Sequence, residues 1–250
     1  TFEEAARDYL AEVKQVQPHG PYLLGGFSGG GLTAWEMAQQ LVAEGEEVAM
    51  LLLLDSRLPQ VPPLRREDRV RMKLMELQRS GPGYLVEWGK NRFEWELGKV
   101  RRRFFPKDDV AQPTPASFQN DKIEAAFYRA LERYRMRHYP GRAILFRPKL
   151  EPLYVIDDDH WIDDEDKYLF HDNGFGKYAD DIEVYEMPGD HDSMVLEPNV
   201  RVMARRLKRC IERAELEIEF RERNEEPPPR DPREVELAHT IRGPRDFTAA

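Results

Sequence analysis

Residues 20–31 read GPYLLGGFSGGG, and the fold can be worked out from this stretch. The apolar run that begins at Tyr22 has the length of a buried strand, and the residues from Leu32 to Val42 recur at helical intervals. A second apolar run, Val48–Leu54, is typical of a parallel strand that is buried on both faces. A strand, a helix and a strand within about 35 residues form a βαβ unit. The stretch therefore predicts an α/β fold.

Outward from this unit, further helices and strands are expected. Thr1 and Glu4 have capping-box spacing, which predicts a helix at the start of the chain. The apolar runs at 143–146 and 182–187 indicate two more strands, and apolar residues at helical spacing between 200 and 211 indicate a closing helix. The α/β pattern thus resumes after a long interruption.

Three regions of different composition divide the chain. We expect one α/β domain over residues 1–216, interrupted by an inserted helical region at about 59–138 that is rich in charged residues. Residues 217–250 are charged and proline-rich with few large apolar side chains, which is typical of a tail or linker without a core of its own.

The composition excludes several classes of protein. The 250 residues include 38 Lys and Arg against 47 Asp and Glu, a net charge of −9, which disfavours a nucleic-acid-binding protein. The single cysteine, Cys210, permits no internal disulfide, and this favours a reducing, cytoplasmic location. No apolar run approaches the roughly 20 residues needed to span a bilayer. The chain begins at Thr1 without a Met, so we expect a piece of a longer polypeptide.

The segment from Gly26 to Gly30 has the pattern G-x-S-x-G between the first strand and the following helix. A nucleophilic serine on such a turn needs small neighbours, because the chain passes closely while the hydroxyl points outward. The backbone N–H of Gly29 is then placed to donate to an oxyanion. An ordinary glycine-rich turn or a phosphate loop is the alternative, although no Gly-Lys-Ser/Thr follows. We interpret Ser28 as a catalytic nucleophile.

A serine nucleophile needs a base, and His191 is the candidate among six histidines. It follows the last strand in a turn with Pro188 and Gly189, at the carboxyl edge of the sheet that also presents Ser28. The alternative is a loop histidine that simply pairs with neighbouring carboxylates.

The acid that orients the base is expected to be Asp55, which ends the strand Val48–Leu54 on the same edge. Its alternative role is to cap a turn through Ser56. Asp157, Asp158 and Asp159 are rival acids, and the whole acidic stretch 157–166 could hold a divalent cation. It lacks EF-hand spacing, and a solvated loop is the simpler interpretation, so we assign no metal site.

Several motifs together resemble a known family, the thioesterase domains that end modular polyketide and nonribosomal-peptide synthases. The resemblance covers roughly Thr1 to Ala214. Its motifs are the stretch 20–31, Leu54-Asp55-Ser56, Tyr139-Pro140-Gly141, and Pro188-Gly189-Asp190-His191 followed by Met194 and Pro198.

This resemblance implies an α/β-hydrolase fold with a helical lid and a triad of Ser28, His191 and Asp55. It implies that the acyl chain arrives on the phosphopantetheine arm of a carrier domain, without a further cofactor, and leaves by hydrolysis or cyclisation. Family members have further strands before the segment that begins at Thr1, including the one that supplies a second oxyanion donor. We expect those strands to be absent from this chain.

Two other functions remain open at this point. One is a freestanding editing thioesterase or a carboxylesterase, and the other is a catalytically idle α/β domain that binds a carrier or another protein. Residues 64–103 hold 12 Lys and Arg against 6 Asp and Glu. This surplus, with Arg101, Arg102 and Arg103, suits either a solvated helix face or a docking surface for an acidic carrier.

Overall fold

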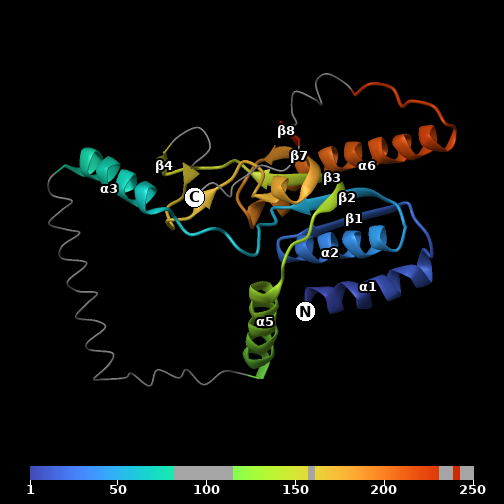
Figure 1. Ribbon diagram of the computed structural model, residues 1–250, viewed down its shortest axis with the longest axis horizontal. Coiled ribbons are helices and arrows are strands. Elements are labelled where there is room, and N and C mark those ends of the chain that lie inside the picture. The colour runs from blue at the N-terminus through green and yellow to red at the C-terminus, as the bar shows by residue number, and fades with distance from the viewer. Residues whose placement is uncertain (82–114, 157–160, 231–238, 243–250) are drawn as a thin grey trace. The chain divides into compact units, whose positions relative to one another are not determined.

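A five-stranded sheet in the order β1-β2-β3-β7-β8 organises most of the computed structural model (Figure 1). Strands β1, β2, β3 and β7 are parallel, whereas β8 pairs antiparallel with β7. The structure describes residues 1–81, 115–156, 161–230 and 239–242. The five strands are β1 (Tyr22–Phe27), β2 (Val48–Leu54), β3 (Tyr139–Pro148), β7 (Ala179–Met187) and β8 (His239–Arg242).

Helices cover both faces of this sheet. The α1 helix (Phe2–Val16) and the α2 helix (Gly29–Ala43) lie on one face, and α6 (Val200–Glu222) lies on the other (Figure 1). Alternate residues of β2 pack into the two cores: Leu51 and Leu53 pack with α1 and α2, whereas Met50 and Leu52 pack with α6. A mostly parallel sheet between two layers of helices confirms the expected α/β-hydrolase fold.

The local signals in the first 54 residues are confirmed by the structure. Thr1 and Glu4 form a capping box at the start of α1. The apolar run 48–54 is β2, and it pairs in parallel with β1. Short 3₁₀ turns, η1 (Phe175–Lys177) and η2 (Ser193–Val195), flank β7.

The chain divides into two compact units. Residues 1–60, 129–151 and 170–250 form the first, called here the sheet unit, and residues 61–128 and 152–169 form the second, called the insert unit. The expected insertion at about 59–138 overlaps the first segment of the insert unit. The second segment, 152–169, carries no periodic signal that would have separated it from the α/β pattern.

The insert unit combines helices with a small sheet. Among the described residues, its helical elements are α3 (Arg66–Ser80) and most of α5 (Pro115–Arg133), whose last residues belong to the sheet unit. The antiparallel strands β4 (Tyr154–Val155), β5 (Trp161–Ile162) and β6 (Tyr168–Leu169) form a three-stranded sheet. These strands belong to the insert unit but lie outside the expected lid region at about 59–138.

The end of the chain takes part in the sheet unit. The α6 helix continues to Glu222, so the expected boundary at residue 216 falls inside a helix. Further on, β8 adds an edge strand to β7, with Ile241 opposite Ile182. Between these two elements, Arg230 pairs with Glu183 of β7.

The opposite edge of the sheet is open within the described residues. There, β1 pairs only with β2, and its Leu23 and Phe27 side chains are exposed. An open edge with apolar side chains is a surface on which another strand can pair.

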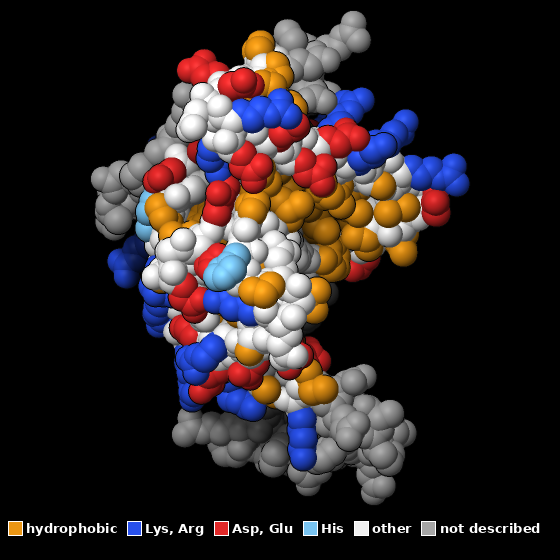
Figure 2. Space-filling model, turned by 90° about the vertical axis from the view of Figure 1, so that its right-hand side faces the viewer, with side chains coloured by type: hydrophobic (Ala, Val, Ile, Leu, Met, Phe, Trp, Pro, Cys, Tyr) orange, Lys and Arg blue, Asp and Glu red, His pale blue; other side chains and the backbone are white. Residues whose placement is uncertain are grey.

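Figure 2 shows one face of the molecule, on which hydrophobic side chains gather between acidic and basic ones. None of the helices in the described ranges is long and apolar enough to cross a membrane.

Candidate active site

Ser28 occupies a strained turn between β1 and α2. Its φ of 54° and ψ of −122° lie outside the regions that non-glycine residues favour. The Ser28 side chain makes no capping hydrogen bond to α2, so its hydroxyl is not used to hold the helix. Gly29 opens α2, and its N–H belongs to the first helical turn, whose N–H groups have no acceptor within the helix. The turn therefore suits both an exposed nucleophile and an oxyanion.

Two glycines allow this turn, because neighbouring atoms approach them so closely that a side chain would not fit. A Cβ on Gly26 would lie 2.2 Å from the backbone carbon of Gly30, and a Cβ on Gly31 would lie 1.9 Å from Ser56 Oγ. Neither position can take a larger residue without movement of its neighbours. These glycines of the quoted stretch are thus required by packing.

The Asp55 carboxylate and the His191 imidazole are hydrogen bonded. Asp55 follows the carboxyl end of β2, and His191 lies in the loop after β7, with 2.7 Å between Asp55 Oδ2 and His191 Nδ1. The Asp55 side chain is only 4% exposed, whereas that of His191 is 39% exposed. A buried carboxylate on Nδ1 directs the other ring nitrogen, Nε2, toward proton transfer.

Other histidines also contact carboxylates, so pairing alone does not identify a base. His19 Nδ1 lies 2.9 Å from Glu46, and His138 Nε2 lies 2.7 Å from Asp180. Their carboxylate side chains are 19% and 61% exposed. Of these three histidines, His191 is the one whose carboxylate partner follows a strand at the carboxyl edge of the sheet, beside the Ser28 turn.

Asp55 is also held through its second oxygen. Asn173 Nδ2 donates to Asp55 Oδ1 at 3.3 Å and to the Ser56 carbonyl at 2.8 Å. The Ser56 hydroxyl in turn donates to the Ser28 carbonyl at 2.8 Å. Sequence reasoning missed Asn173, although Asn173-Gly174 is a turn dipeptide that marks a backbone with positive φ.

The Phe27 ring contacts the His191 ring, and hydrogen bonds hold the turn that carries this histidine. The Phe27 ring stacks on it with centroids 4.8 Å apart. In the turn that carries the histidine, Ser193 donates to Asp190 Oδ1 from its hydroxyl at 2.7 Å and from its backbone at 2.8 Å. These hydrogen bonds lower the pKa of Asp190 and keep it an acceptor.

A buried arginine lies near the candidate acid. Arg147 is almost fully buried at the end of β3, and its Nε donates to the His171 carbonyl at 2.7 Å. Burial lowers the pKa of Arg147, while attraction to Glu186, and more weakly to Asp55, acts in the opposite direction. The sheet edge thus contains a fixed positive charge close to Asp55.

The geometry therefore brings Asp55 and His191 together next to the Ser28 turn, all within the sheet unit. Among the described residues, no hydrogen bond joins Ser28 Oγ to His191; such bonds are often long before a substrate binds.

The rival acids 157–159 and the basic residues 101–103 lie outside the described residues. Within the described ranges, no group of three or more His, Cys, Asp or Glu side chains could hold a metal ion. In the acidic stretch, Asp163 Oδ1 accepts from the Glu165 and Lys167 backbones, as in a turn.

Comparison with known proteins gives one family. Residues 1–143 match the family described as Thioesterase domain. The chain is 54% identical over 63 residues to the non-reducing polyketide synthase atnG of Arthrinium sp.. The aligned residues are 25% of this chain and 3% of that protein. The chain is 36% identical over 125 residues to the non-reducing polyketide synthase PKS1 of Zymoseptoria tritici, covering 49% of this chain and 6% of that protein. The chain thus spans only a small part of these relatives.

Solved structures show the same fold. The NocB thioesterase domain, in covalent complex with a fluorophosphonate nocardicin G analog, matches with a TM-score of 0.51 and 25% identity over 84% of this chain and 74% of that chain. A four-domain nonribosomal peptide synthetase, AB3403, matches with a TM-score of 0.52 and 23% identity over 84% of this chain and 16% of that chain.

Proposed function

This chain belongs to the thioesterase-domain family, and we propose that it releases an acyl chain from a carrier-domain thioester through an acyl-enzyme on Ser28. The observation that carries this proposal is the 2.7 Å hydrogen bond between His191 and the buried Asp55 carboxylate beside the strained Ser28 turn. An Asp–His pair next to a G-x-S-x-G turn is the arrangement that activates a serine hydroxyl.

In the first half of the proposed reaction, His191 Nε2 takes the proton of Ser28 Oγ, which attacks the thioester carbonyl carbon. The carbonyl oxygen becomes an oxyanion and accepts a hydrogen bond from the Gly29 N–H. Its collapse breaks the carbon–sulfur bond, and the pantetheine thiol leaves with the proton from His191. Asp55 stabilises the imidazolium while it exists.

In the second half, His191 accepts a proton from an attacking group, which bonds to the acyl carbon, and returns a proton to Ser28 Oγ. Water as the attacking group gives a free acid. A hydroxyl or amine of the bound chain gives a ring. The same three residues serve both outcomes, so the shape of the acyl pocket decides between them.

The proposed substrate is a chain carried on the phosphopantetheine of a carrier domain, in the same or a partner polypeptide. The names of the relatives support this class of substrate, because those proteins are polyketide synthases. The match to the NocB thioesterase domain supports it as well.

A fluorophosphonate tests the nucleophile directly, since it bonds to an activated serine and loses fluoride. We expect intact mass spectrometry to show one phosphonyl group per chain, and peptide mapping to place it on Ser28. Ser28→Ala removes the label. A folded native chain that takes up no label would contradict the proposal and would favour an idle binding domain.

Two histidine variants test the base. We expect His191→Gln to slow labelling by roughly a thousandfold, the scale at which loss of a triad member acts. His19→Gln is the matched control, because His19 also pairs with a carboxylate but is largely exposed. Equal labelling rates in these two variants would exclude His191 as the base.

Substrate preference separates chain release from a general esterase. An acyl group is offered either on a phosphopantetheinylated carrier domain or as a simple oxygen ester of the same acid. We expect turnover to favour the carrier thioester, and the product mass distinguishes a free acid from a ring that is lighter by one water. Preference for the oxygen ester would support a carboxylesterase.

A further inference from the structure

A buried arginine on β3 lies at the same edge of the sheet as the candidate acid. Leu54 of β2 pairs with Phe146 of β3, and Asp55 and Arg147 each follow this pair by one residue. The Phe146 carbonyl accepts the Asp55 N–H at 2.7 Å, and the Arg147 side chain is only 1% exposed. A guanidinium is thus buried beside the backbone that carries the candidate acid.

Stability alone does not favour an arginine at this place. Burial removes the hydration of a guanidinium, and a nearby carboxylate offsets only part of that cost. The ion pair of Arg147 is with Glu186 at 3.2 Å, whose side chain is 43% exposed, while Asp55 and Asp172 attract it more weakly. Burial is the main cause of the lowered pKa of Arg147, which reflects this cost. The groups that its N–H donors hold in place are therefore the more informative feature.

The guanidinium holds the loop that precedes η1. Arg147 Nε donates to the His171 carbonyl at 2.7 Å. Within the loop, the buried Asp172 carboxylate accepts the Gly174 N–H at 2.8 Å and the Gly176 N–H at 3.0 Å. The loop is therefore fixed to β3 at one point and braced internally by a second charged group.

The same loop carries Asn173, which contacts the candidate acid. Asn173 Nδ2 donates to Asp55 Oδ1 at 3.3 Å. The Asn173 backbone N–H donates to the Phe170 carbonyl at 3.0 Å, which closes a turn over His171. The carbonyl that Arg147 holds and the amide that contacts Asp55 thus belong to one turn. A path of hydrogen bonds leads from the arginine through this turn to the acid.

We propose that Arg147 is a positioning residue for the candidate triad. Its Nε–H holds the His171 carbonyl and thereby keeps the Asn173 amide in contact with the acid. This inference rests on the proposed function, in which the acid orients the base. Without the hydrogen bond the turn is released, and the Asp55 carboxylate loses a donor that fixes its orientation. Because the effect passes through Asn173, it can be no larger than that of removing the Asn173 amide.

Two substitutions of equal charge separate the hydrogen bond from the charge. Glutamine places an N–H donor where the Arg147 Nε lies, whereas methionine places a methyl group there, and both remove the positive charge. The measurement is the rate at which the fluorophosphonate labels Ser28, taken on chains that urea unfolding shows to be folded. We expect Arg147→Met to label about tenfold more slowly than the native chain, and Arg147→Gln to stay within about threefold of it.

A double-mutant cycle tests the path through the turn. In the Asn173→Ala chain, Arg147→Met should change the labelling rate less than about twofold, because the path is already broken. A role of Arg147 in stability alone would lower the rate by the same factor in both chains. Arg142→Met is the matched control, since Arg142 lies on the same strand and pairs with Glu183 and Glu217. Its labelling rate should equal that of the native chain.

Arg147→Lys replaces Arg147→Met if the latter unfolds, because lysine keeps the charge but has a methylene group where Nε lies. Three results would each overturn this inference while Ser28 still reacts: a native rate in Arg147→Met, an equal loss in Arg147→Met and Arg147→Gln, or the full loss in the Asn173→Ala chain. A folded native chain that takes up no label would overturn the proposed function itself, and this inference with it.

Discussion

Backbone strain gathers at three residues of the candidate site. Ser28, Asp55 and Asn173 have φ values of 54°, 42° and 50°, in the left-handed region that non-glycine residues seldom adopt. Each such residue costs about 1–3 kcal/mol and persists only where its surroundings hold it. Here the Ser28 N–H donates to the Leu54 carbonyl at 2.8 Å, and the Asp55 N–H donates to the Phe146 carbonyl at 2.7 Å. The neighbouring strands therefore hold these residues in place.

Asn173 is predicted to act as a positioning residue for Asp55. In Asn173→Ala the Asp55 carboxylate loses its hydrogen bond at Oδ1 while the pair with His191 remains. A hydrogen bond to a charged group contributes about 1.5–3 kcal/mol, so we expect the fluorophosphonate labelling rate to fall roughly ten- to hundredfold. The measurement is the labelling rate as a function of pH.

The matched control is Asn224→Ala, since Asn224 also has a left-handed φ, of 55°, but lies exposed at the end of α6. Its labelling rate should equal that of the native chain. We expect Asn173→Gln to restore part of the lost labelling rate, because its side-chain amide can still donate to Asp55. A purely structural role of Asn173 predicts no such rescue. An unchanged rate and pH profile in a folded Asn173→Ala chain would show that Asn173 does not position the acid.

At the level of elements, the start of α2 approaches the loop after β2 too closely for side chains. A Cβ on Gly31 would overlap Ser56 Oγ, and the Ser56 hydroxyl also donates to the Ser28 carbonyl. The glycines of the Ser28 turn therefore set the distance between the nucleophile and the acid-bearing loop.

Alanine substitutions at adjacent glycines should separate packing from helix propensity. In Gly31→Ala the new methyl group meets Ser56 Oγ, and we expect the free energy of unfolding to fall by about 1–3 kcal/mol, as in overpacked cores. In Gly30→Ala the methyl group meets nothing within 4 Å, so stability should stay the same or rise slightly. Urea unfolding measures both. A loss in Gly30→Ala as large as in Gly31→Ala would contradict this packing.

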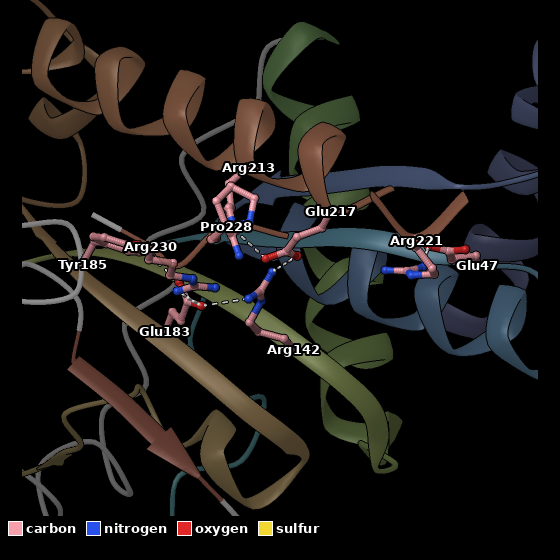
Figure 3. Close-up of polar contacts among 9 residues, drawn as sticks. All are labelled: Glu47, Arg142, Glu183, Tyr185, Arg213, Glu217, Arg221, Pro228 and Arg230. Atoms are coloured by element: carbon pink, nitrogen blue, oxygen red, sulfur yellow. Dashed lines mark hydrogen bonds and ion pairs between the residues drawn. The ribbon is translucent and has the colours of Figure 1, made fainter. Parts of the chain in front are cut away.

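On the scale of the whole molecule, ion pairs connect the last helix to the sheet (Figure 3). Glu217 connects that helix to β3 through Arg142 and pairs with Arg213 on α6 itself. Burial raises the pKa of Glu217, but the two guanidiniums outweigh it and the pKa is lowered. The ionised Glu217 carboxylate therefore connects the closing helix to the sheet.

The lowered pKa of Glu217 predicts the pH dependence of stability. Because the unfolded chain binds this proton more readily than the folded one, the stabilisation is complete above the ordinary pKa of 4.5. It is lost as the pH falls below that value through the lower pKa of the folded state. At pH 7 we expect Glu217→Gln to lower the free energy of unfolding by about 1.5–3 kcal/mol, the value of hydrogen bonds to charged groups, and this difference should shrink in acid.

Urea unfolding between pH 3 and pH 7 would measure this difference. Glu215→Gln, an exposed position on the same helix, is the control and should follow the native chain throughout. A difference between Glu217→Gln and the native chain that stays constant across this range would mean that ionisation of Glu217 does not stabilise the fold.

The sequence by itself determined the local elements and the three residues that we assign to catalysis. Glycines around Ser28, the unbroken apolar run of β2 before Asp55 and the Pro-Gly turn before His191 are signals within a few residues. Parallel strands place their carboxyl ends at one edge, so these positions could be brought together without coordinates.

Only the tertiary structure decided the contacts between distant segments. Asn173 reaches Asp55 across 118 residues, and Arg230 returns to Glu183 from a segment that composition classed as a tail. The strands β4 to β6 have two residues each, too few for a periodic pattern. Hydrophobic periodicity records which face of an element is apolar, but partner choice between polar groups depends on long-range packing, and therefore no local pattern contains it.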